Sequence, residues 1–575
     1  MNHETYLRKM FVANTSHEQD FLSIWSKLLS PEKFDRLINS RGYQFYELIF
    51  RNIKEEDFRC LYSEKLSAPN SPVNCLVGAM LLCHYRNWSH EELVDQIDFN
   101  VSTRVALGLK DLEYRPFCAR TLYNFKNRLS SYSQQTGVNL LEKVFEDLTA
   151  EQLAKLPIKT SIQRADSVLL NSNIQSYSRL SLLVEVLRRL YYILSEEDQR
   201  HYHIYFKPYL QGGEKYMYSL KKEEGQTRLE YISTIYYTLH RMLGDNYKET
   251  QIYQVFERVY IEHFKEVQTT DKFPIQIRPQ KELGSNILQS PDDLEATYRN
   301  KRKESYQGFV VYGAETCHPD NELNLVTSLD VSTNNTDDSV ILEDKIDQMK
   351  ETTPDLVELH TDGGFPSKGV DVKAEKHNIN LIQTAVKGTT PNVPIAVQGN
   401  EEEGFTIDCP NQEHPPVMAK KAKKNWMADF QLEICQQCPF FDQCPTKRER
   451  KYKKGTAILR FKATESLKQK RHKAIQKIPP ERQTLRPGVE KLMGLMRRGE
   501  KNTGKMKFRG RFNFELYTFS MGIVINFERI FKYLKAKNEL FFAFSSSLGS
   551  RNVSCQTTFN NVLVILFFSK YLKRI

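Results

Sequence analysis

The amino-acid sequence predicts an α/β protein in which a mixed sheet is flanked by helices, interrupted by insertions and preceded by an all-α domain. Three observations support this prediction. Helical patterns fill residues 1–157, strand-like and helical runs alternate over residues 158–387, and a clear helix returns at residue 486. This order of elements favours a mixed sheet with helices over a barrel or a sandwich. With 575 residues, the chain is also too long for a single hydrophobic core.

Residues 1–157 are predicted to form a helical N-terminal domain. Ser71 is expected to cap a helix that has Pro72 at its first position, where proline is favoured. Ser89 and Glu92 have the spacing of a capping box, in which each side chain accepts a hydrogen bond from the other residue's backbone. Both signals indicate that short, separate helices begin here.

A basic helix is predicted over residues 119–129, "ARTLYNFKNRL", with Leu122, Phe125 and Leu129 on one face. Short helices that end in a basic one, here over residues 71–130, resemble a helix-turn-helix, whose last helix enters the major groove of DNA. An ordinary helical bundle with a basic surface is the alternative. The candidate DNA-binding residues of this helix are Arg120, Lys126 and Arg128.

The predicted sheet begins at residues 158–176, where a strand leads into Asp166. A mostly helical insertion is expected over residues 177–300, because apolar residues recur there at helical spacing. The sheet then continues over residues 301–387. Its expected elements are a hairpin at 305–331, a helix at 337–349, a strand at 356–361 that ends at Asp362, a helix after Pro366 and a strand at 379–386.

Residues 388–485 are predicted to form a polar, basic insertion with four cysteines in the pattern C-x25-C-x2-C-x5-C. A CxxC pair lets two thiolates reach one ion, and four thiolates suit tetrahedral Zn²⁺. Thiols without a metal in a basic loop are the alternative, because the spacing matches no zinc finger that we can name. His414 is a spare ligand. The candidate zinc ligands are Cys409, Cys435, Cys438 and Cys444.

A helix is predicted over residues 486–498, within a C-terminal segment that we expect over 486–535. Glu490 lies beside its apolar stripe, Arg497 follows two turns later on the same side, and Gly494 lies between them with no side chain. This arrangement would suit a helix that faces DNA. The apolar stripe consists of Val489, Leu492, Met493 and Met496. The tail, residues 536–575, has no role that we can assign from the sequence.

Two aspartates, Asp166 and Asp362, are predicted at the ends of strands that could be neighbours in one sheet. Ligands bind at such strand ends, although Asp-Gly is also common turn chemistry. Glu490 taken alone could be an ordinary surface acid of a helix. Rival carboxylates are Asp330, which ends a predicted strand, and Glu515, whose apolar surroundings resemble a helix core.

Taken in order, these acids resemble the signature of a bacterial insertion-sequence DDE transposase, which has an RNase H-like catalytic core. The large group that the chain most resembles carries Tyr-x2-Arg-x3-Glu-x6-Lys around its last acid. Here Arg486, Glu490 and Arg497 have that spacing. Gln483 replaces the tyrosine and Arg497 replaces the lysine, and these departures bear on how DNA ends are handled more than on metal binding. The resemblance covers residues 60–135 and 158–535.

The resemblance implies that Asp166, Asp362 and Glu490 are the catalytic acids and bind Mg²⁺ or Mn²⁺. Three acids can hold two such ions roughly 3.5–4 Å apart for in-line phosphoryl displacement. Water attack would nick each element end, and the freed 3′-OH would attack target DNA. Partners would be double-stranded DNA and a second copy of the chain. The residues expected to contact DNA near this site are Arg486, Arg497, Arg498, Lys505 and Lys507.

Two other functions stay open at this point: a non-catalytic, sequence-specific DNA-binding protein, and an RNase H-like nuclease without strand transfer. The formal charge of +11 is unevenly distributed, because residues 497–511 hold seven basic side chains and one acid, and residues 447–454 hold six and one. Such clusters can neutralise phosphates. With no signal peptide and no membrane-spanning run in view, we expect a cytoplasmic, nucleoid-associated protein.

Overall fold

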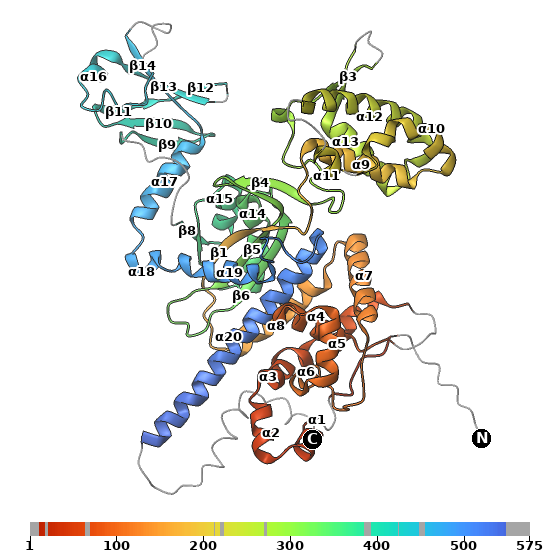
Figure 1. Cartoon of the computed structure of the whole chain (residues 1–575). Helices are drawn as coiled ribbons and strands as arrows, with labels where there is room; N and C mark the ends of the chain where they lie inside the picture. Colours follow the sequence, from red (N-terminus) through yellow and green to blue (C-terminus); the bar gives the residue numbers. More distant parts are fainter. Residues whose placement is uncertain are drawn as a thin grey trace. The chain divides into compact units, whose positions relative to one another are not determined.

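The chain divides into two compact units, and segments of the two units alternate along the sequence. Unit 1 comprises Met1–Lys159, Ser167–Asp337 and Lys491–Ile575, and unit 2 comprises Thr160–Asp166 and Asp338–Glu490. Figure 1 shows the elements of both units. The computed structural model describes residues 11–17, 21–63, 70–211, 213–218, 224–268, 273–383, 393–423, 425–447 and 455–547.

Unit 1 begins with helices, as the sequence predicts for this part of the chain. The capping box at the start of α5 is confirmed, since the Glu92 amide donates to Ser89 Oγ at 3.0 Å and the Ser89 amide donates to Glu92 Oε2 at 2.6 Å. The predicted cap of α4 is wrong by one residue, because Pro72 itself is the N-cap and α4 starts at Val73. The N-terminal helices are α1 (Phe21–Leu28), α2 (Pro31–Ile38), α3 (Arg41–Leu48), η1 (Phe50–Asn52), η2 (Glu55–Leu61), α4 (Val73–Arg86), α5 (His90–Phe99), α6 (Val101–Ala106), α7 (Ala119–Thr136) and α8 (Leu140–Lys155).

The predicted basic helix corresponds to the first part of α7, which packs against α5. Its apolar face is confirmed, because Leu122, Phe125 and Leu129 are all buried. The burial of one face leaves the remaining faces of α7 to carry polar and basic side chains.

The antiparallel part of the sheet lies in unit 1. β5 (Glu304–Thr316) pairs with β4 (Thr297–Lys301) and with β6 (Val326–Thr333), so the predicted hairpin is confirmed. The later residues of β1 (Ile162–Asn171) run beside β5. The long helix α20 (Arg511–Ser547) packs against β6, α8 and α4 through buried residues such as Phe514 and Phe519.

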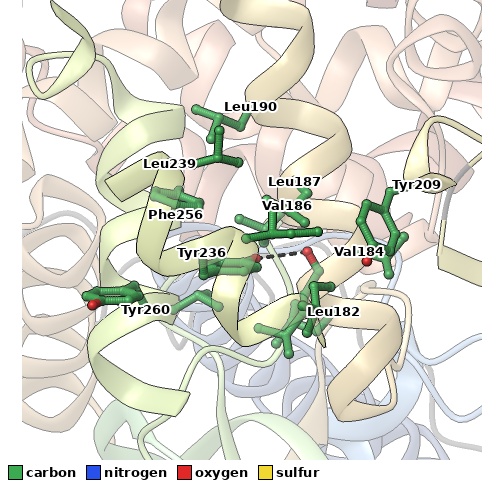
Figure 2. Packing of buried hydrophobic residues seen from close by; sticks show 14 of the residues in the cluster. Leu182, Val184, Val186, Leu187, Leu190, Tyr209, Tyr236, Leu239, Phe256 and Tyr260 are labelled. Carbon is green, nitrogen blue, oxygen red and sulfur yellow. Dashed lines mark hydrogen bonds between the residues drawn. The ribbon is translucent and has the colours of Figure 1, made fainter. Parts of the chain in front are cut away.

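The helical insertion is confirmed and has a core of its own (Figure 2). Leu187 and Leu190 of α9 meet Tyr236 and Leu239 of α12 in this core. The Tyr236 hydroxyl donates to the Leu183 carbonyl at 2.8 Å, so the ring is buried without losing a hydrogen bond. The insertion consists of α9 (Arg179–Ile193), α10 (Glu196–Phe206), η3 (Lys207–Tyr209), α11 (Gly213–Tyr218), α12 (Gly225–Tyr247), α13 (Gln251–His263), β2 (Phe264–Glu266), β3 (Ile275–Ile277) and η5 (Gln280–Glu282).

The parallel part of the sheet lies in unit 2, where β7 (Glu358–Thr361) pairs with the first residues of β1 and with β8 (Asn380–Gln383). As predicted, a helix precedes β7 and another follows it: α14 (Asp338–Thr352) and α15 (Lys368–Lys376). These two helices pack against each other. The prediction that the first strand ends at Asp166 is wrong. β1 continues to Asn171 because the residues after Asp166 are also apolar and buried.

Residues 393–461 form two small antiparallel sheets that the sequence analysis did not predict; we call them the two-sheet module. Their shared core includes Phe405, Trp426, Phe430 and Leu459. The basic run after Lys447 lies outside the described residues. The strand orders are β11-β10-β9 and β12-β13-β14. The elements are β9 (Ala396–Asn400), β10 (Gly404–Cys409), β11 (Gln412–Met418), β12 (Lys420–Ala422), β13 (Asn425–Gln431), α16 (Leu432–Gln436) and β14 (Thr456–Phe461).

The predicted helix at 486–498 is confirmed as a helical stretch of three pieces: η6 (Arg486–Gly488), α19 (Val489–Met496) and η7 (Arg497–Gly499). The four residues of its apolar stripe are all buried. Two helices precede it, α17 (Thr464–Gln476) and α18 (Pro480–Gln483). Among the residues described, no helix combines the length and apolarity needed to span a membrane.

Candidate active site

The parallel pairing of β1 with β7 determines where the two predicted aspartates lie. Ile162 is the partner of Glu358, and Arg164 is the partner of His360. Asp166 comes two residues after Arg164 on β1, and Asp362 comes two residues after His360, directly past the end of β7. Because residues two apart on a strand share a face, the register brings these aspartates to the same side of the sheet.

Asp362 follows the last residue of β7 and also shapes the turn after it. Its Oδ1 accepts a hydrogen bond from the Gly364 amide at 2.7 Å. A Cβ on Gly364 would lie 2.9 Å from this oxygen and 2.9 Å from Oδ2 of Asp338, so only glycine fits without displacing a carboxylate. The turn therefore occupies Oδ1 of Asp362, and the second oxygen, Oδ2, remains at the edge of the sheet.

All three predicted acids meet at the guanidinium of Arg486. Its Nη2 lies 2.6 Å from Oδ2 of Asp166 and 3.9 Å from Oδ2 of Asp362, and its Nη1 lies 3.1 Å from Oε1 of Glu490. The Arg486 side chain is 16% exposed, whereas Glu490 is 66% exposed. All four residues belong to unit 2. Asp166 and Glu490 are 324 positions apart in the sequence, yet both contact the Arg486 guanidinium.

A second arginine holds the turn from which Arg486 projects. Arg164, two residues before Asp166 on β1, donates from Nη1 to the Leu485 carbonyl at 2.6 Å. Its guanidinium also fills the space beside Gly488, where a Cβ would come within 2.0 Å of Nη1. Sequence reasoning missed this positioning residue. The sequence signal for Arg164 is its position two residues before Asp166, which puts both side chains on the same face of the strand.

A third arginine ties α18 to β7. Arg482 Nη1 lies 2.7 Å from Oε1 of Glu358, and the same oxygen lies 2.6 Å from Nε2 of His360. Burial lowers the pKa of His360, although its bond to Glu358 acts in the opposite direction. His360 is therefore neutral at pH 7 and serves as a hydrogen-bonding residue under the site.

Three carboxylates lie around the Arg486 guanidinium, and a group of carboxylates is a donor set that fits divalent cations. Carboxylate oxygens are the ligands that Mg²⁺ and Mn²⁺ prefer. Arg486 Nε is buried and finds no hydrogen-bond partner among the described residues, so the arginine is incompletely satisfied where it stands. Within that described part, no three potential ligands are already arranged around one point. Binding of divalent ions by the three acids would therefore displace Arg486 from them.

The other predicted basic residues of the C-terminal segment lie in unit 1. Arg497 donates to the Leu169 carbonyl at 3.4 Å and pairs with Glu500 at 3.4 Å. Lys505 donates to the Ile174 carbonyl at 2.7 Å and Lys507 to that of Asn87 at 3.2 Å, while Arg498 is exposed. Gly494 has open space where a side chain would be.

On α7, the predicted DNA-binding residues differ in accessibility. Arg120 and Arg128 are exposed, and the Arg128 guanidinium stacks 5.0 Å over the Tyr62 ring. Lys126 is half-buried, and burial lowers its pKa. Arg120 and Arg128 are therefore more accessible for phosphate contacts than Lys126.

The rival acids have other partners in unit 1. Asp330 accepts a hydrogen bond from Ser332 at 2.8 Å within β6. Glu515 of α20 pairs with Arg511 at 2.9 Å and accepts from Asn139 at 3.1 Å, and burial raises its pKa. Both fit structural roles. The side chains of Gln483 and His414 lie outside the described part of the chain.

Comparisons with protein-family models found two matches. A model described as "Transposase DDE domain" matches residues 408–531, which include Glu490, and a model described as "Transposase domain (DUF772)" matches residues 32–128. Both descriptions are of transposase domains, and each match covers less than half of the chain. More particularly, the two matches support an insertion-sequence DDE transposase, as the sequence resemblance implies. Searches of curated proteins and of solved structures gave no match.

Proposed function

We propose that this chain cuts the ends of an insertion sequence and joins the freed 3′-OH ends to target DNA. The convergence of Asp166, Asp362 and Glu490 on one cationic group is the observation that carries the proposal. A protein that only binds DNA has no use for three carboxylates in one place, because they repel phosphates. The strand order β4-β5-β1-β7-β8, with β7 parallel to β1, also supports an RNase H-like core.

The three acids would hold the divalent ions, with Asp362 contributing the oxygen that the Gly364 amide does not use. When bound, Mg²⁺ or Mn²⁺ stabilises the charge on the attacking and leaving oxygens of a phosphoryl displacement. Arg486 would then exchange its carboxylate partners for a DNA phosphate, which accepts both of its Nη groups in the same bidentate way. Arg164 would keep the Arg486 turn in place during this exchange.

DNA itself would be recognised by two basic regions of unit 1. Arg120 and Arg128 project from α7, where a recognition helix of a helix-turn-helix would present them to the major groove. The segment 497–511, with Arg498 and Lys507 exposed, would neutralise phosphates without reading sequence.

A cleavage and joining assay tests the proposal. Purified protein, Mg²⁺ and labelled end DNA should give nicked ends and strand-transfer products. Asp166→Asn, Asp362→Asn and Glu490→Gln should each lower both products by roughly 100-fold or more, because metal ions supply several kcal/mol of transition-state stabilisation. Asp330→Asn is the matched control and should keep activity.

The same assay separates the alternatives. Normal cleavage by all three acid variants would contradict the site. Cleavage without joined products in the native protein would instead indicate a nuclease, and binding without cleavage would indicate a DNA-binding protein.

A further inference from the structure

Four cysteines from three separate segments line one hollow in the two-sheet module. They are Cys409, Cys435, Cys438 and Cys444, and the hollow measures about 450 Å³ including the space open to solvent. We infer that these four thiols bind one structural Zn²⁺. This site is chemically distinct from the carboxylate site, because its ligands are sulfur.

The first segment is tied to the second by a side chain between them. Cys409 is the last residue of β10, and it faces Gln412 across the turn to β11. In that turn, Asn411 donates from Nδ2 to the Ile434 carbonyl at 3.2 Å. Because Ile434 directly precedes Cys435, this bond brings together two cysteines that are 26 positions apart in the sequence.

The CxxC pair is held by two successive tight turns. The Cys438 amide donates to the Cys435 carbonyl at 3.1 Å, and the Phe441 amide donates to the Cys438 carbonyl at 3.0 Å. A CxxC turn of this kind lets both sulfurs face one ion.

The fourth cysteine is fixed from its C-terminal side. Thr446 donates from Oγ1 to the Cys444 sulfur at 3.3 Å. The next residue, Lys447, exchanges two backbone hydrogen bonds with Ile458 of β14, at 2.8 and 3.0 Å. Cys444 is therefore anchored to the sheet that also supports α16.

The lining of the hollow favours a soft metal. Apart from the sulfurs, its surface is largely apolar, with Phe430 and Phe441 among the lining residues, and none of the lining residues that the structure describes carries a carboxylate. Thiolates select Zn²⁺ over Mg²⁺, and an apolar surround excludes water that would compete for the metal. Three of the cysteines, Cys409, Cys435 and Cys444, also pack at the edge of the module's core, so a bound ion would link both sheets.

A metal link has a structural purpose in a module this small. Small cores supply little net stability, and structural metals are a common supplement. No three potential ligands in the described residues are yet at ligating positions, so binding would draw the sulfurs inward and tighten the module.

Metal analysis of the full-length protein tests the inference. Protein purified without chelator should contain about one zinc per chain. The Cys435→Ser, Cys438→Ser double variant should lose it, whereas Cys60→Ser, Cys118→Ser, which changes two exposed cysteines of the N-terminal domain, should keep it. A zinc content near zero in the wild-type protein, or iron in its place, would overturn the inference.

A second measurement covers the case in which the double variant does not fold. Metal-free wild-type protein titrated with Co²⁺ should develop thiolate-to-metal charge-transfer absorption and the visible bands of a tetrahedral site, and Zn²⁺ should displace the cobalt. Absence of the charge-transfer absorption would refute the site. Neither result depends on DNA cleavage, so the proposed catalytic function is tested separately.

Discussion

At the scale of single residues, Asp362 stabilises a turn with one carboxylate oxygen and presents the other at the proposed site. A carboxylate has two oxygens, and the Gly364 amide occupies only one of them, at 2.7 Å. The second faces the Arg486 guanidinium. The turn therefore fixes the orientation of the group that would bind a metal, and this restricts its rotation before any ion arrives.

Arg486 is the residue whose replacement separates metal binding from DNA handling. Its guanidinium contacts all three acids and would compete with divalent ions for them. We expect Arg486→Ala to bind Mn²⁺ about 3–10-fold more tightly in the absence of DNA, equivalent to about 1 kcal/mol. The same variant should lose DNA cleavage, because a phosphate contact disappears. Electron paramagnetic resonance of free Mn²⁺ measures the first effect.

The control for this experiment is Arg482→Ala, which removes a nearby arginine bound to Glu358 and not to the three acids. It should leave Mn²⁺ affinity unchanged. Weaker Mn²⁺ binding by Arg486→Ala would show that the arginine organises the acids and does not compete for them.

Single residues also show what the sequence could predict. The acids and Arg486 follow from residue type and spacing, because the resemblance fixes their order. Arg164 does not follow in this way, since its contacts with Leu485 and Gly488 join segments more than 300 residues apart. Long-range partners of this kind depend on tertiary register, which a single sequence does not specify.

At the scale of elements, the parallel register of β1 and β7 creates the site, and most elements around it were predictable. In the helices and the hairpin, apolar residues recur at a clear helical or strand spacing. The two-sheet module was missed, although Phe405 and Ile407, and Trp426, Ala428 and Phe430, alternate as buried strand residues. Its strands are short and lie among lysines and prolines, so composition favoured a loop over the weaker alternation signal.

The helical insertion should lose stability in acid because of His263. Burial, with a further contribution from Arg179, lowers the pKa of His263 to about 3, and Nδ1 accepts a hydrogen bond from Arg179 Nε at 3.1 Å. In the unfolded chain, the pKa of a histidine is about 6.5. The unfolded segment therefore binds more protons below pH 6.5, and the free energy of opening should fall between pH 6.5 and 3, by up to about 1.4 kcal/mol per pH unit.

Hydrogen exchange of the α12 and α13 amides, corrected for intrinsic rates, measures this dependence. His263→Gln keeps an acceptor for Arg179 but cannot titrate, so its protection should change less between pH 7 and 5 than that of the wild type. His201→Gln, on α10, should behave as the wild type does. An equal loss of protection in both variants would exclude His263 as the cause.

At the scale of the whole molecule, the chain passes between its two units within β1 and again within α19. Unit 2 contains the three acids, and unit 1 contains the basic residues of α7 and of segment 497–511. The sequence predicts both the set of acids and the basic segments. It could not predict that the boundary falls inside two continuous elements, because periodicity does not reveal contacts between segments.

One set of acids per chain implies more than one chain for two element ends. We expect the complex with paired ends to contain two protomers, each of 67.3 kDa. Light scattering after size-exclusion chromatography, with and without end DNA, measures this mass. A complex that joins both ends with one protomer would contradict the expectation.

The central claim is that Asp166, Asp362 and Glu490 together form a site for divalent cations, and Mn²⁺ binding to the full-length protein tests it most directly. Each of Asp166→Asn, Asp362→Asn and Glu490→Gln should weaken Mn²⁺ binding by about 10-fold or more, equivalent to about 1.4 kcal/mol. Asp330→Asn should bind as the wild type does. Equal Mn²⁺ affinity in the wild type and all three acid variants would contradict the account.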